Sequence, residues 1–239
     1  MMIIDIQDCS VLPAHLVQGL LSYKAAFKRE TYVENMYEIS GFRGLAEGVD
    51  TWIRANHIRA YHCTKAPSLD FFRKHGLRLL DRKAHQDEFL VKYGNLFTDA
   101  EQRDMVESWD AYFPGTQDKV RNGRTYFCVS RNLVRSPGTE RFLKFFGGEA
   151  LYMPLAPESS SAMKLANIGI PAVVEVVLPG RDFVSPSYSF SLTMLSYFHQ
   201  AINPFARIFD CEAHVVRNVE PREVTRVTSL SEFDVEKCR

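Results

Sequence analysis

Three well-separated segments of the sequence carry side chains that can bind or transform a small molecule. The first contains His62 and Thr64 and continues to Gly76, the second contains Tyr126, and the third contains Glu212. An imidazole can form hydrogen bonds or exchange a proton near neutral pH, an aromatic ring can stack, and a carboxylate can stabilise positive charge. These residues can act together only if the folded chain brings the three segments together.

Common catalytic signatures are absent from the sequence. It contains no GxGxxG that opens a helix after a strand, no GxxxxGK[ST], no HExxH and no GxSxG, which leaves a Rossmann dehydrogenase, a P-loop kinase, a zincin and an α/β-hydrolase unsupported. The 5 cysteines form no CxxC pair, and the 7 histidines show no metal-ligand spacing. We therefore expect reduced thiols and no metal site.

In their order along the chain, the three segments resemble the sheet motifs of the ADP-ribosyltransferase superfamily. The shared pattern is a strand with His followed by Thr, a helix ending in Gly-Leu, a second strand with Tyr, and a late strand with Glu. The final part, from Glu212 through Pro221 to Val224, is similar to the end of DNA-targeting ADP-ribosyltransferase toxins and of tRNA 2′-phosphotransferases. The resemblance spans residues 57–228. It implies NAD as substrate, release of nicotinamide, and a bacterial or phage toxin or defence effector.

The resemblance assigns a cofactor-binding role to several of these residues. His62 matches the histidine that hydrogen-bonds the cofactor ribose, with Thr64 and Gly76 in the same binding set. Thr64 has a structural alternative as the cap of the following helix. Tyr126 matches the aromatic residue that stacks on nicotinamide, and its structural alternative is a core position.

The resemblance also identifies the catalytic carboxylate as Glu212, which would bind the 2′-hydroxyl of the nicotinamide ribose and stabilise the developing cation. Glu149 is the alternative, because the preceding glycines Gly147 and Gly148 allow close approach of a ligand. These glycines follow an expected helix rather than opening one, so they make a poor phosphate cradle of the helix-start type. Glu175, among valines, is a weaker third choice.

The acceptor is less well defined than the cofactor. Arginine-specific members carry Glu or Gln two residues before the catalytic Glu, where this chain has Asp210, which argues against arginine as acceptor. The segment from 119 to 144 is rich in basic residues and is either a solvated surface or a binding surface for the NAD pyrophosphate or a nucleic acid. Its basic residues are Lys119, Arg121, Arg124, Arg131, Arg135, Arg141 and Lys144, against one acid, Glu140. The acceptor is therefore expected to be protein or nucleic acid. The alternatives are an NAD glycohydrolase, with water as acceptor, and a non-catalytic module that binds nucleotide or a partner.

The composition is that of a soluble globular protein. The chain has 239 residues, 29 basic against 29 acidic side chains, and 46% hydrophobic residues, which excludes a disordered tail, a fibre and a disulfide scaffold. No apolar run is long enough to span a membrane, and the start lacks the pattern of a secretory signal. A cytoplasmic protein without membrane contact is expected.

The hydrophobic pattern predicts an α+β fold with a mixed or antiparallel sheet. The resemblance to ADP-ribosyltransferases implies that this sheet is split and has flanking helices. We expect helices over 12–27, 49–56, 66–75, 99–113, 139–146, 160–167 and 188–202, and strands over 58–63, 124–130, 172–178, 212–219 and 223–227. A boundary near residue 45 would separate an N-terminal helical extension, 1–45, from a transferase-like domain, 46–239. The extension would gate the site, bind a neutralising partner or pad the core.

Overall fold

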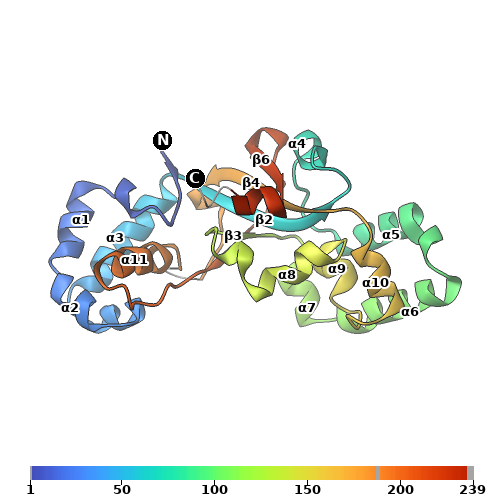
Figure 1. Ribbon diagram of the computed structural model, residues 1–239, viewed down its shortest axis with the longest axis horizontal. Coiled ribbons are helices and arrows are strands. Elements are labelled where there is room, and N and C mark those ends of the chain that lie inside the picture. Colours follow the sequence, from blue (N-terminus) through green and yellow to red (C-terminus); the bar gives the residue numbers. More distant parts are fainter. Residues whose placement is uncertain (1, 187–188, 236–239) are drawn as a thin grey trace. The chain divides into compact units, whose positions relative to one another are not determined.

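The computed structural model describes residues 2–186 and 189–235 and has an α+β fold (Figure 1). Within these residues, a six-stranded, mostly antiparallel sheet has the strand order β5-β3-β2-β4-β6, and β1 pairs with β2. This confirms the predicted fold class. The strands are β1 (Ile3–Ile4), β2 (His57–Ala66), β3 (Thr125–Cys128), β4 (Ile170–Pro179), β5 (Glu212–Val215) and β6 (Val224–Ser229).

The chain packs as two compact units, each assembled from separate stretches of sequence. The first unit contains residues 1–61, 127–133 and 177–214, and the second contains 62–126, 134–176 and 215–239. The boundary that the sequence suggests near residue 45 stays a prediction.

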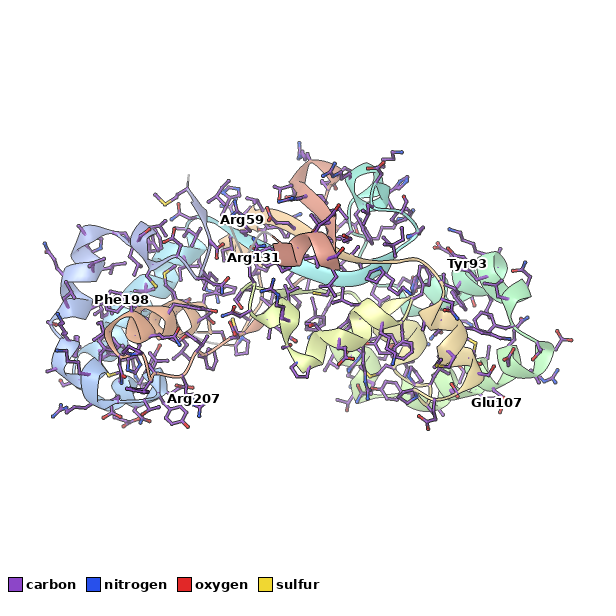
Figure 2. The ribbon with its side chains drawn as sticks, in the orientation of Figure 1. Arg59, Tyr93, Glu107, Arg131, Phe198 and Arg207 are labelled. Atoms are coloured by element: carbon purple, nitrogen blue, oxygen red, sulfur yellow. The ribbon has the colours of Figure 1, made fainter. Side chains whose placement is uncertain are left out.

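Four helices form the helical part of the first unit: α1 (Ala14–Leu21), α2 (Lys24–Arg29), α3 (Phe42–Arg54) and α11 (Ser189–Ile202). Helix α3 packs against α11, because its apolar residues Phe42, Ala46, Val49 and Ile53 recur at helical spacing and are buried (Figure 1). Phe198 of α11, labelled in Figure 2, meets Phe27 of α2 edge-on, with ring centroids 5.7 Å apart.

The helix expected over 12–27 is split into α1 and α2. The break falls at Ser22, whose hydroxyl donates to the carbonyl of Gly19 at 2.6 Å. A serine hydroxyl that bonds a nearby carbonyl competes with the regular backbone pattern.

The second unit contains a cluster of helices with an aromatic core. Its aromatic core includes Phe89, Trp109 and Phe146, and Tyr93, labelled in Figure 2, packs against it. The helices of this unit are α4 (Phe71–His75), α5 (Arg82–Tyr93), α6 (Asp99–Tyr112), α7 (Thr116–Arg121), α8 (Pro137–Lys144), α9 (Gly148–Tyr152), α10 (Ser160–Ala166) and α12 (Leu230–Val235).

The helix expected over 99–113 is confirmed as α6, and a capping box marks its start. The amide of Thr98 donates to the Glu101 carboxylate at 2.7 Å, and the amide of Glu101 donates to the Thr98 hydroxyl at 3.2 Å. Short 3₁₀ turns connect other elements of the chain and cover Cys9–Val11, Val33–Glu38, Gly94–Leu96, Leu133–Arg135, Gly180–Asp182 and Pro221–Glu223.

Two expectations about helix ends are wrong. The helix expected from residue 66 begins only at Phe71. The glycine pair does open a helix, since Gly147, with φ 89°, is the N-cap of α9. Among the described residues, no helix has the length and apolar character needed to cross a membrane.

Candidate functional site

His62 and Tyr126 meet in the second unit through a hydrogen bond between β2 and β3. Nδ1 of His62 lies 2.9 Å from the carbonyl oxygen of Tyr126. A carbonyl can only accept, so Nδ1 carries the hydrogen and Nε2 carries a lone pair. Burial lowers the pKa of His62, although the bond to Tyr126 acts in the opposite direction. The imidazole is therefore neutral near pH 7.

Tyr126 is half-buried, and its hydroxyl donates to the carbonyl of Val120 at 2.5 Å. One residue thus holds His62 through its carbonyl and is anchored to α7 through its phenol. The phenol hydroxyl of Tyr126 is therefore engaged within the second unit.

Gly76 and Leu77 join the end of the first motif to the third. Leu77 and Val219 exchange both backbone hydrogen bonds, at 2.9 and 2.8 Å. Gly76 has φ 67°, and a Cβ at this position would lie 2.0 Å from the carbonyl oxygen of Val219. Only glycine fits here, so Gly76 allows its backbone to lie close to that of Val219.

Thr64 follows His62 by two positions on β2, and side chains at that spacing lie on one face of a strand. The residue that caps the following helix is Asp70. The capping alternative for Thr64 is therefore wrong.

Glu149 is the second residue of α9 in the second unit and is paired with Arg121. Nε of Arg121 lies 2.7 Å from Oε2, Nη2 lies 3.3 Å from Oε1, and the two side chains are 19% and 21% exposed. Most of the charge of this carboxylate is already compensated. Burial, together with the charge of Glu149, raises the pKa of the neighbouring Tyr152.

Side chains from α5 and α6 hold the backbone of α9. Nε2 of His85 lies 3.2 Å from the Gly147 carbonyl, Gln86 donates to Ala150 at 3.0 Å, and Trp109 donates to Leu151 at 2.9 Å. The carbonyls of a short helix lack intrahelical partners, and these donors supply them.

Glu212 lies in the first unit as the first residue of β5, and its side chain is exposed. This side chain forms no hydrogen bond or ion pair within the part of the chain that the structure describes. Glu175, on β4 of the second unit, accepts from the hydroxyl of Thr225 at 2.8 Å, so it is engaged with β6.

The basic stretch is divided between the two units, and several of its members have intramolecular contacts. Arg121 pairs with Glu149. Arg131, labelled in Figure 2, lies 6.0 Å from the ring centroid of Tyr61 in the first unit. In the second unit Lys144 lies 5.2 Å from the ring centroid of Phe145.

A polar network in the first unit contains residues that sequence reasoning missed. Asp210 accepts from the hydroxyls of Ser130 and Tyr197, and Tyr197 accepts from Gln7 and Asn132. Burial and the charge of Asp210 raise the pKa of Tyr197 to about 12. Asp210 precedes Glu212 by two residues, and Ser130 is the last residue of the strand expected over 124–130. Gln7 and Tyr197 carried no signal in the sequence.

The second unit also has a hollow of about 390 Å³ between α5, α6 and the turn before α7. Arg82 lies in it, ion-paired to Asp118 at 2.9 Å and 4.9 Å from the ring centroid of Phe113. No residue of the expected site lines this hollow; its lining is Arg82, Trp109, Asp110, Phe113, Pro114, Gly115 and Asp118.

No protein-family model, no curated protein and no solved structure matches this chain. The resemblance to ADP-ribosyltransferases therefore depends on the quoted residues. In the described ranges, no group of three or more His, Cys, Asp or Glu side chains is arranged to hold a metal ion, and Cys9, Cys63, Cys128 and Cys211 are free thiols.

Proposed function

We propose that this protein transfers ADP-ribose from NAD⁺ to a protein or nucleic-acid acceptor and releases nicotinamide. The observation that supports this most is the hydrogen bond from His62 to the backbone of Tyr126. It joins two of the three motifs within one unit, while burial keeps the imidazole neutral. In the proposed site this imidazole binds the cofactor ribose. The proposed setting is a cytoplasmic bacterial or phage toxin or defence effector, opposed by a neutralising partner protein.

In the proposed reaction the bond between nicotinamide and the ribose carbon breaks, and nicotinamide leaves with the electron pair. The acceptor nucleophile then bonds to that carbon and loses its proton to solvent. The transition state resembles an oxocarbenium ion, so a bound dinucleotide conformation and a nearby negative charge lower its energy.

Glu212 is the carboxylate that we assign to this role. Its side chain is exposed and forms no hydrogen bond or ion pair within the described chain, so its charge is available to a ribose. Glu149 is less suited, because Arg121 already neutralises it at 2.7 Å.

The assignment is tested by nicotinamide release from NAD⁺, with and without cell lysate. Glu212→Gln is expected to lower the rate by about 100-fold or more, the scale of losing one electrostatic contact to a transition state. Glu149→Gln and the exposed Glu38→Gln should keep most of the rate. A fully active Glu212→Gln protein would overturn the assignment, and the Glu149→Gln rate would then decide the alternative.

The same assay separates the other functions. Release that requires lysate supports transfer, and lysate depleted of nucleic acid then shows whether the acceptor is protein. Release without lysate indicates an NAD glycohydrolase. Absence of both release and a thermal shift with NAD⁺ would contradict the proposal and favour a non-catalytic binding module.

A further inference from the structure

Asp210, two residues before Glu212, uses one carboxylate oxygen to accept two hydrogen bonds. The hydroxyl of Ser130 lies 2.5 Å from Oδ1 and the hydroxyl of Tyr197 lies 3.3 Å from the same atom. All of these residues belong to the first unit.

The two donors are held in place by further bonds. Ser130 is fully buried and accepts from the amide of Leu133 at 3.1 Å. Tyr197 accepts from the side-chain amides of Gln7 at 2.8 Å and Asn132 at 2.9 Å. The Tyr197 hydroxyl and Oδ1 of Asp210 thus connect four segments. These are the N-terminal segment, the turn after β3, α11 and the segment before β5.

Backbone bonds complete the support on both sides of Glu212. Val129 donates to the carbonyl of Cys211 at 3.5 Å, and Val184 and His214 exchange bonds at 2.7 and 3.0 Å. The backbone of Glu212 is therefore held before and after the residue, while its side chain stays exposed.

We propose that Asp210 is a positioning residue, which sets the start of β5 and so the direction of Glu212, and that it does not bind a cationic acceptor. This inference rests on the proposed transferase function. A carboxylate oxygen that serves two internal hydroxyls has part of its charge dispersed by them. A guanidinium held by Asp210 would have to compete with these two hydroxyls.

Two substitutions separate positioning from recognition of charge. Asp210→Asn keeps Oδ1 as an acceptor and removes the charge, whereas Asp210→Ala removes both. If Asp210 positions Glu212, Asp210→Ala should lower kcat for nicotinamide release by about 10-fold or more, with the KM for NAD⁺ changed less than about twofold, and Asp210→Asn should restore most of kcat. If Asp210 binds a cationic acceptor, both variants should lose transfer equally while NAD⁺ hydrolysis continues, and this result would overturn the inference.

Hydrogen exchange of the amides of residues 211–216 gives a readout that needs no activity. Asp210→Ala should accelerate this exchange by about 10-fold or more. Asp210→Asn and the exposed control Glu38→Ala should leave it unchanged. If Asp210→Ala does not fold, Tyr197→Phe takes its place and should produce a smaller acceleration than about 10-fold. Unchanged exchange in Asp210→Ala would refute the positioning role. A wild-type protein that never releases nicotinamide would instead refute the proposed function, whatever the exchange shows.

Discussion

At the level of single residues, burial sets the charge state of His62 and His85, both in the second unit. His62 bonds the Tyr126 carbonyl and His85 bonds the Gly147 carbonyl. Burial lowers the pKa of both, more than these backbone bonds raise it. Both imidazoles are therefore neutral at pH 7 and resist protonation in the folded state.

These two histidines should make stability depend on pH. Below their ordinary pKa of about 6.5 the unfolded chain binds more protons than the folded chain, so the free energy of unfolding falls as the pH drops from 6.5 toward the lowered pKa values. His62→Gln and His85→Gln should each make this fall shallower. Urea unfolding at pH 7, 6 and 5 measures the effect, and variants with the same pH slope as wild type would contradict it.

At the level of elements, α9 is a short helix whose position depends on its neighbours. Gly147 and Gly148 both have positive φ, at 89° and 59°. They differ in the space beside them, because a Cβ on Gly147 would lie 2.0 Å from Cδ1 of Leu151, whereas a Cβ on Gly148 meets nothing within 4 Å.

Alanine at these two glycines should therefore have unequal effects. Gly148→Ala should cost only the left-handed backbone conformation, about 1–2 kcal/mol. Gly147→Ala adds a clash with a buried leucine and should cost about 1–3 kcal/mol more. Urea midpoints of the two variants provide the comparison. Equal midpoints would show that α9 shifts freely.

The N-terminus of α6 offers a second test at this scale. Thr98→Ala removes the acceptor for the amide of Glu101 and should lower the free energy of unfolding by about 1 kcal/mol. Thr98→Ser keeps the hydroxyl and should retain most of the stability. Denaturant unfolding of the pair measures the cap, and equal losses in both variants would assign the effect to the Thr98 methyl group.

At the level of the whole molecule, the first unit brings the N-terminal helices together with α11, which comes much later in the chain. Helix α11 contacts α2, α3 and the 3₁₀ turns at Cys9–Val11 and Val33–Glu38. It buries Phe190, Met194 and Leu195 completely. Residues 1–45 thus cover apolar surface contributed by 189–202.

Deletion of residues 1–45 should expose this surface and make the protein aggregate or lose the cooperative unfolding of the first unit. Size-exclusion chromatography and thermal unfolding of residues 46–239 test this. A monomer with an unchanged melting temperature would support the alternative, in which 1–45 is a separable helical extension.

Local signals in the sequence were sufficient for elements whose pattern is complete within a few residues. Helix α6 and the valine-rich strand β4 were predicted in this way. Helix α5 was missed because it is mostly polar and buries only Gln86 and Phe89. Helix α9 was missed because five residues are too few to show a helical period.

The sequence by itself determined the α+β class, the order of the motifs and the side chains available for chemistry, because propensities, caps and apolar periods act between near neighbours. Only the tertiary structure decided which distant residues meet. Ser130 and Asp210 are 80 positions apart and Gln7 and Tyr197 are 190 apart, yet each pair shares a hydrogen bond. Such contacts follow from how helices and strands pack, and packing depends on the whole chain rather than on any short segment of it.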